Sequence, residues 1–375
     1  MPLPSSRFDA RMLLRSLQRG LAVFDAGLLL PLAVVILISG FTMYSAAFDF
    51  PGRFTGHLRN MAVALSLMWL VALIPPIRLM QLGLPLYALG LLLLIAVDLF
   101  GIINKGAQRW LDLGITRIQP SELLKIAVPL MLAWYFNQRA GVLRWVDFVV
   151  AGGLLAVPVF MIAKQPDLGT AILVAAAGLY VIFFAGLSWK VIVGGALAGL
   201  ASLPLVWSML HDYQRQRVLT LIDPSSDPLG KGFHIIQSTI AVGSGGLTGK
   251  GWMEGTQTHL EFIPERTTDF ILAVYAEEFG LLGAAVLMTL YLAIISRGLV
   301  ISGTATTTFG RLLAGSLTLS FFTYCFVNIG MVIGVLPVVG VPLPWMSYGG
   351  TAMVTLGLGA GMLMSIHRHR ALMPG

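Results

Sequence analysis

The chain has 375 residues, of which 57% are hydrophobic and only 11% are charged. A soluble domain carries about a quarter of its residues as charges, so this composition excludes an ordinary soluble protein and indicates one embedded in a bilayer. The formal net charge of +7 would suggest nucleic-acid binding in a soluble chain, but here we attribute it to membrane topology and expect no nucleic-acid partner.

Ten apolar stretches are each long enough to cross a hydrocarbon core of about 30 Å as a helix. A long loop, about 209–267, separates the seventh stretch from the eighth. We therefore predict an all-α integral membrane protein of about ten transmembrane helices, forming a single polytopic membrane domain over residues 1–375. The stretches lie approximately at 25–46, 57–75, 79–102, 120–137, 144–163, 169–186, 189–208, 268–297, 309–334 and 348–367.

The charge pattern predicts the orientation of these spans. An even number of spans places both termini on one side of the membrane, and Arg7, Arg11, Arg15 and Arg19 precede the first span. Because Lys and Arg gather on cytoplasmic segments near span ends, both termini are expected in the cytoplasm and the long loop outside. The first span is too long for a signal-peptide core and is expected to be an uncleaved anchor.

A first polar cluster lies where the fourth span begins at the outer interface. Trp110 suits that depth because its ring is apolar and its N–H is polar, and Arg109 stands beside it. Glu122 and Lys125 are three residues apart and so share one helix face. Ionisable groups in a span usually face the bundle interior or a water-filled cavity. An ion pair that fixes packing and a direct role in a binding site are both open interpretations.

Asp167 follows the next outer turn and precedes the sixth span, where it is expected to cap the helix; a second role in positioning a substrate is the alternative. In the long loop, a glycine-rich run over 243–251 ends in Lys250 and Gly251. It is not a P-loop, because Ser244 replaces the first glycine and Gly251 replaces the Ser or Thr that would hold Mg²⁺. Its backbone N–H groups could still cradle phosphate oxygens, or the run could be a flexible hinge.

The sharpest candidate is Asp269, where the long loop meets the eighth span. One interpretation is a helix N-cap. The other is a general base, because a carboxylate at the outer mouth is placed to take a proton from a substrate hydroxyl. Glu277 and Glu278 lie about two turns deeper, where they are costly unless paired or hydrated; we expect them to pair mainly with charges on neighbouring helices.

The connection before the tenth span, residues 337–350, contains three prolines and two adjacent glycines. Such a rigid, non-helical segment is tolerated at membrane depth where it is buried or lines a cavity. Ser347 and Tyr348 could offer hydroxyls to a substrate there. The six histidines show no zinc-ligand spacing, and the single cysteine, Cys325, excludes a cysteine-based metal site.

Together these motifs resemble the SEDS family (shape, elongation, division and sporulation), the ten-span peptidoglycan polymerases of bacteria. The resemblance covers almost the whole chain, and the stretches 255–262 and 307–311 are more similar to the elongation branch than to the division branch. In chain order the motifs read Gly106, Arg109-Trp110 and Gly114; Gln119-Pro120-Ser121-Glu122 and Lys125; Gln165-Pro166-Asp167 and Gly169; Asp227-Pro228 and Gly230; Pro264-Glu265 and Thr268-Asp269-Phe270; and Pro342-Leu343-Pro344 and Ser347-Tyr348-Gly349-Gly350.

The resemblance implies glycosyl transfer from lipid II in the bacterial inner membrane. It also implies a partner, a class B penicillin-binding protein that performs transpeptidation, within an elongation complex. Carried over by motif, Asp269 is the catalytic residue, and Trp110, Glu122 and Lys125 are associated with function.

The reaction would join the 4-OH of the acceptor sugar to an anomeric carbon and release undecaprenyl pyrophosphate. Fixed cations stabilise such a leaving group; the candidates are, in falling order, Arg109, Lys125, Arg217 and Lys250. A divalent cation, Mg²⁺ or Mn²⁺, could share that work, although the sequence shows no closed metal cage.

Two other functions compete with polymerisation. A lipid II flippase would use Glu122, Lys125, Glu277 and Glu278 as a polar track, and broken mid-membrane helices or a paired inverted repeat would favour it. A non-enzymatic scaffold would recruit the transpeptidase and would tolerate replacement of Asp269.

Overall fold

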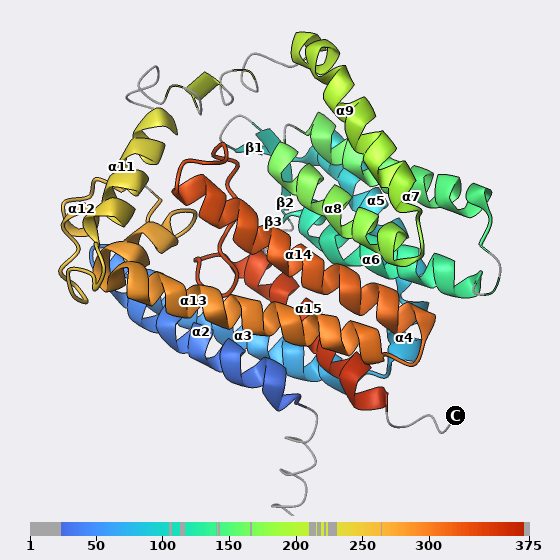
Figure 1. The fold of residues 1–375 in the computed structure, drawn as a ribbon, viewed down its shortest axis with the longest axis horizontal. Coiled ribbons are helices and arrows are strands. Elements are labelled where there is room, and N and C mark those ends of the chain that lie inside the picture. Colours follow the sequence, from blue (N-terminus) through green and yellow to red (C-terminus); the bar gives the residue numbers. More distant parts are fainter. Residues whose placement is uncertain are drawn as a thin grey trace, which may run out of the picture.

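The computed structural model describes residues 24–104, 107–112, 117–139, 141, 143–165, 167–209, 215, 219–220, 223, 231–263 and 265–370. Within these residues the fold is a bundle of long helices, which confirms the all-α membrane architecture (Figure 1). In chain order the long helices are α2 (Ala26–Ala46), α3 (Arg53–Leu73), α4 (Pro76–Gln81) with α5 (Gly83–Phe100), α6 (Pro120–Gln138), α7 (Trp145–Lys164), α8 (Leu168–Phe184), α9 (Trp189–Met209), α13 (Ile271–Thr304), α14 (Thr308–Val332) and α15 (Gly350–His369).

Seven helices of the described chain are long and apolar enough to cross a membrane. The three remaining predicted spans coincide with α6, α8 and α9, which are helical over 19, 17 and 21 residues. The count of ten spans therefore stays a prediction.

Pro120 occupies the first turn of α6, as expected for a residue whose missing N–H costs nothing there.

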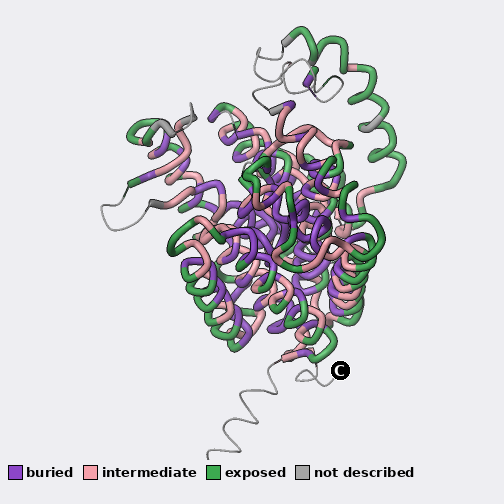
Figure 2. Tube along the Cα trace, turned by 90° about the vertical axis from the view of Figure 1, so that its left-hand side faces the viewer, coloured by how far each residue is buried: buried purple, intermediate pink, exposed green. Residues whose placement is uncertain are grey.

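The helices α6 and α14 form the centre of the bundle. They contact each other, and both contact α8 and α15. Buried residues gather in this central part (Figure 2), where the side chains are mainly Leu, Ala, Val and Met. The helix α9 lies at the periphery, and its described residues are almost all exposed.

The two described chain ends lie at the same end of the bundle. Asp25, the N-cap of α2, accepts a hydrogen bond of 2.9 Å from Arg297 of α13 and lies 3.0 Å from the ring of His367 of α15. This agrees with the prediction that the termini share one side. Residues 1–23, with the four N-terminal arginines, lie outside the described part.

At the opposite end, called the outer end below, the connections carry more structure than the sequence predicted. The connection between α5 and α6 forms a short antiparallel sheet in the order β1 (Ile102–Asn104), β2 (Ala107–Asp112) and β3 (Arg117–Ile118). Two helices, α11 (Lys231–Ser244) and α12 (Thr256–His259), lie in the long loop, and α11 packs on α13 and α14.

The helix α13 is interrupted, which corrects the prediction of one continuous eighth span. Gly280 has φ 63° and ψ −161°, a conformation that glycine adopts readily. The residues beyond it, 281–304, rise by about 1.5 Å each, or about 36 Å, and can cross a core of about 30 Å by themselves. The outer segment, 271–279, which carries Glu277 and Glu278, is therefore not needed for the crossing.

Candidate active site

Asp269 stands at the outer end of the bundle, directly before α13. The N-cap position belongs to Phe270, so Asp269 lies one residue outside the position that the N-cap interpretation assigned to it. Its side chain is partly exposed and faces the connection between α14 and α15: a Cβ built on Gly340 would lie 3.4 Å from its Oδ2. Asp269 is therefore neither sealed among hydrocarbon side chains nor fully solvated.

Asn328 of α14 holds the backbone of Asp269 in place. This side chain is fully buried, and its Nδ2 donates to the carbonyl oxygens of Asp269 at 2.8 Å and of Val341 at 2.7 Å. It thus joins α14, the start of α13 and the connection before α15. Sequence reasoning missed Asn328, although an amide inside an apolar span is costly and usually has a specific partner.

The connection before α15 is also pinned to residues 267 and 268. The Ser347 hydroxyl donates to the Thr268 carbonyl at 2.6 Å and accepts from the Leu343 N–H at 2.8 Å. The N–H of Tyr348 donates to the Thr267 carbonyl at 2.8 Å. Since Ser347 is only 3% exposed, its hydroxyl is not available to a substrate in this conformation, contrary to the expected role. We assign it to holding the connection beside Asp269.

Tyr348 is partly exposed and packs on the start of α3. The guanidinium carbon of Arg53 lies 4.6 Å from the centroid of its ring, a cation–π geometry. A Cβ on Gly56 would lie 3.0 Å from its hydroxyl oxygen. Its predicted contact with a substrate stays a prediction.

Arg109 of β2 joins a polar cluster on the other side of the same connection. Its guanidinium lies 3.7 Å from the Asp167 carboxylate, which also accepts a hydrogen bond of 3.1 Å from Gln119. Asp167 accepts from the N–H of Thr170, so its predicted capping of α8 is confirmed. A Cβ on Gly169 would lie 2.9 Å from the Val339 carbonyl. Gly169, two residues after Asp167, and Asp269 therefore approach neighbouring residues of one connection, 339 and 340.

Glu122 and Lys125 form the expected ion pair on α6, at 2.6 Å. The Lys125 side chain is 6% exposed, and its ammonium lies 5.1 Å from the centroid of the Tyr324 ring. Lys125 also borders an interior cavity of about 70 Å³ between α2, α6, α8, α13, α14 and α15. An unpaired charge at this depth would be costly, so each partner depends on the other.

A larger cleft of about 590 Å³ opens beside this pair, between α3, α5, α6 and α15. Its outer rim carries Trp110, Gln119 and Glu122, and much of its remaining lining is apolar, with Val63, Leu93, Leu123, Val354 and Leu358. The cleft thus joins polar groups at the outer end to an apolar groove between membrane helices. Trp110 lies where the sequence placed it, at this boundary.

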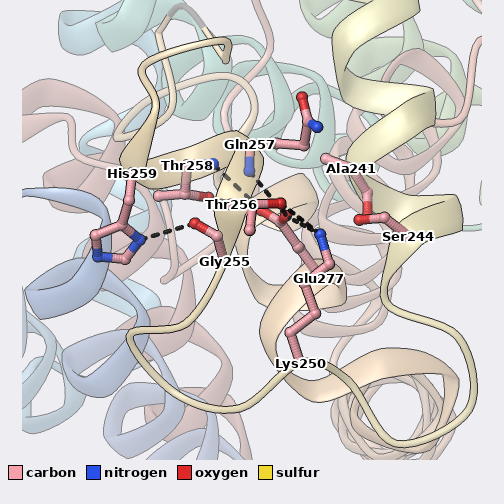
Figure 3. A network of polar contacts seen from close by, with 9 residues as sticks. All are labelled: Ala241, Ser244, Lys250, Gly255, Thr256, Gln257, Thr258, His259 and Glu277. Carbon is pink, nitrogen blue, oxygen red and sulfur yellow. Dashed lines mark hydrogen bonds and ion pairs between the residues drawn. The ribbon is translucent and has the colours of Figure 1, made fainter.

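Lys250 is engaged within the long loop and the outer segment of α13. Its ammonium lies 2.7 Å from Glu277 (Figure 3), so the partner of Glu277 comes from the loop rather than from a neighbouring helix, which corrects the sequence-based expectation. The N–H groups of Lys250 and Gly251 donate to the carbonyls of Glu277 and Glu278 at 3.0 Å. These two N–H groups are therefore not free to cradle phosphate. Arg217 lies outside the described residues.

Arg266 neighbours Asp269 in sequence but serves the α2–α3 connection. It is 4% exposed, donates to the Ala46 carbonyl at 3.0 Å, forms an ion pair with Asp49, and lies 4.9 Å from the ring centroids of Phe48 and Phe50. Burial alone would raise the pKa of Asp49, but the hydrogen bond and charge of Arg266 hold it below its usual value. That stabilisation is present near neutral pH and is lost as the pH falls through the lowered pKa.

Replacing Arg266 with alanine should destabilise the fold by about 3 kcal/mol, because it leaves Asp49 and the Ala46 carbonyl without their partner. Thermal unfolding of the detergent-solubilised protein should show a clearly lowered midpoint at neutral pH. The difference should shrink in acid, where Asp49 is protonated. An unchanged midpoint at neutral pH would show that this contact is dispensable.

Among the residues that the structure describes, no group of three or more His, Cys, Asp or Glu side chains could hold a metal ion. Glu122, Asp167 and Asp269 are each engaged on a different part of the outer end. The described side chains therefore do not fit a closed divalent-cation site.

Similarity to known protein families identifies the family of this chain. The sequence profile of the FtsW, RodA and SpoVE cell cycle proteins matches residues 20–372, almost the whole chain. The chain belongs to this family, the SEDS proteins. The family resemblance inferred from the motifs is therefore confirmed.

Named relatives of the chain are peptidoglycan glycosyltransferases. The chain is 52% identical over 351 residues to the peptidoglycan glycosyltransferase MrdB of Escherichia coli K12, covering 93% of this chain and 95% of that protein. It is 36% identical to the peptidoglycan glycosyltransferase MrdB of Helicobacter pylori J99, covering 78% and 77%.

Solved structures show the same fold. A chain from a peptidoglycan synthase complex, studied for the coordination of polymerization and crosslinking, superposes with a TM-score of 0.80 at 33% identity, covering 92% of this chain and 98% of that one. The rod shape determining protein RodA of Thermus thermophilus superposes with a TM-score of 0.70 at 28% identity, covering 92% and 97%.

Proposed function

We propose that this chain polymerises lipid II into glycan strands, with Asp269 as the general base on the acceptor hydroxyl. The enzymatic class, a peptidoglycan glycosyltransferase, rests on relatives 52% identical over most of the chain. The observation that carries the assignment of the base is the position of Asp269: it is partly exposed, lies at the outer end, and faces Gly340 of the connection before α15.

The proposed step begins when Asp269 takes the proton of the acceptor 4-OH. The oxygen attacks the anomeric carbon of the donor, the bond to the pyrophosphate breaks, and undecaprenyl pyrophosphate leaves. A base must lie within hydrogen-bond reach of the proton it removes, and the clamp of Asn328 on the Asp269 carbonyl supports a fixed position. Direct in-line attack inverts the anomeric centre.

Cations near the outer end would hold the diphosphate. Arg109 is the first candidate because its guanidinium is 29% exposed and lies 3.7 Å from the Asp167 carboxylate, a longer contact than that of Lys250 with Glu277. Lys125 is the second, beside the cleft. Lys250 is a weaker candidate than the sequence suggested, because it already forms an ion pair with Glu277. Arg217 remains a candidate from the sequence, because it lies outside the described residues. The cleft beside Glu122 offers the lipid tail a route into the bilayer.

Replacing Arg109 with alanine should weaken donor use, because one charge-assisted contact to the pyrophosphate is lost. Removing a hydrogen bond to a charged group costs about 1.5–3 kcal/mol, so the KM for lipid II should rise at least about tenfold. Titration of labelled lipid II with the purified variant measures this. An unchanged donor saturation curve would count against a pyrophosphate contact by Arg109.

The cellular context follows from the same assignment. The chain is a multi-pass membrane protein, and we place both termini in the cytoplasm of a bacterium and the Asp269 end outside. A class B penicillin-binding protein is the proposed partner, together with other proteins of cell elongation. The likeness to a chain of a peptidoglycan synthase complex supports such a partner. A divalent cation, Mg²⁺ or Mn²⁺, would have to arrive with the diphosphate substrate.

The flippase alternative gains little from the break in α13. Gly280 is a helix break, the feature that would favour transport, but residues 281–304 are long enough to place it at the outer boundary rather than at the bilayer midplane, where transporter sites lie. The scaffold alternative predicts no turnover by the chain alone or with its partner.

The deciding experiment is polymerisation of fluorescent lipid II by the purified chain in detergent or nanodiscs. Moenomycin is included to silence ordinary glycosyltransferases. Glycan strands that grow with time, with and without the transpeptidase partner, are expected. Movement of lipid II across a vesicle membrane without polymer would favour the flippase instead. The absence of both polymerisation and movement would favour the scaffold.

A further inference from the structure

The outer segment of α13, residues 271–279, is set off from the rest of the helix by Gly280. A glycine-rich turn, residues 245–251, supplies the backbone partners that the interrupted helix lacks. Four backbone hydrogen bonds of 2.9–3.0 Å join the two segments. The N–H groups of Lys250, Gly251, Leu281 and Leu282 donate to the carbonyls of Glu277, Glu278, Gly246 and Leu247 respectively.

The fit between turn and helix requires glycine. A Cβ at Gly249 would lie 2.0 Å from the Glu278 carbonyl oxygen, and one at Gly245 would lie 2.1 Å from that of Ala276. Gly249 also has a φ of 83°, in the left-handed region. The glycine-rich run identified in the sequence is therefore a packed junction and not a free hinge.

Glu277 reinforces this junction with its side chain, which is fully buried. Its carboxylate accepts from the Lys250 ammonium at 2.7 Å and from the backbone N–H groups of Gln257 and Thr258 at 2.9 and 3.2 Å (Figure 3). The hydroxyls of Thr258 and Thr256 add two further contacts, at 3.1 and 3.3 Å. A carboxylate so enclosed has no direct part in the chemistry proposed above.

We propose that Glu277 is a positioning residue for Asp269: it fastens the outer segment of α13 to the loop over 245–258 and thereby sets where the base stands. This inference rests on the proposed role of Asp269. The outer segment is a short rigid rod with Asp269 just before one end and the Gly280 break at the other, so a tilt at the break displaces the carboxylate. A displacement of about 1 Å at a reacting group can cost about 100-fold in rate.

The test replaces the Glu277 contact with a covalent bond that can be opened. Positions 250 and 277 are joined by a backbone hydrogen bond of 3.0 Å and their side chains meet, so a disulfide between Lys250→Cys and Glu277→Cys has suitable spacing. Cys325, the only native cysteine, is changed to serine. Reduced protein should show kcat lowered at least about tenfold relative to the single variant Lys250→Cys, with the KM for lipid II within about twofold of that variant, and oxidation should restore kcat.

Matched controls separate the possible failures. The single variant Lys250→Cys in the same background should not respond to oxidant, and mass spectrometry reports the disulfide. The inference is overturned if the reduced pair keeps parental kcat, if the disulfide does not form, or if it forms without restoring kcat. An active Asp269→Asn variant would instead overturn the proposed function, whatever the cysteine pair shows.

Discussion

Replacing Asp269 with asparagine should abolish polymerisation of lipid II while leaving membrane insertion and folding intact. Asparagine keeps the size of the side chain but cannot accept the acceptor proton at neutral pH. A positioned general base contributes about 10²–10⁴-fold, so turnover should fall by about 1000-fold. Strand formation from fluorescent lipid II measures the loss, and size-exclusion and thermal-unfolding profiles check the fold.

The comparison with Asp269→Glu sharpens this prediction. Glutamate restores the carboxylate but moves it by one methylene, so part of the activity should return. Ser347→Ala is the matched control for the connection beside Asp269, because it removes a bond to the Thr268 carbonyl without touching the base. Normal strand output from Asp269→Asn would contradict the assignment.

Replacing Lys125 with methionine should have the second largest effect. The ammonium lies 2.6 Å from Glu122, which lines the cleft. Removing one cation that stabilises a developing charge costs about 10²–10³-fold, and we expect a turnover loss of that size. Because Glu122 is left without its partner, the thermal midpoint should fall as well.

A double variant separates packing from chemistry at this pair. Lys125→Met with Glu122→Gln removes both charges, so the thermal midpoint should recover while turnover stays low. If turnover recovers along with stability, the pair only fixes helix packing, the alternative that the sequence left open. Turnover and unfolding are measured on the same preparations.

The length of the apolar stretches and the composition predicted the bundle well, because a chain that crosses lipid needs long apolar helices. The predicted boundaries of α6, α7 and α14 agree with the structure within a few residues. The interruption of α13 was missed because a single glycine in a helical pattern, here Gly280 two residues after Glu278, is usually tolerated without a break. Its partner turn lies about 30 residues earlier, and such long-range backbone pairing leaves no local pattern.

The sequence predicted the Glu122–Lys125 pair but not the other partners of the candidate residues. Asp269, Arg109, Trp110, Glu122 and Lys125 lie at the outer end as expected. Sequence spacing could not reveal that the Ser347 hydroxyl is used internally or that Lys250 is bound by Glu277, because both depend on how the long connections fold back.

The role of Asn328 was not predicted, for a related reason. Its role comes from two carbonyls, at Asp269 and Val341, that are brought together only by the tertiary fold. A single amide in a span signals that a partner exists, but not which one.

The most direct test of the account measures binding and bond formation on one preparation of Asp269→Asn. Binding of fluorescent lipid II is followed by a change in anisotropy, and transfer is followed by single-turnover formation of the first glycosidic bond. The account predicts a parental Kd with bond formation lost, because Asp269 acts on the proton while the cleft and the cations hold the substrate. Bond formation at the parental rate would contradict it.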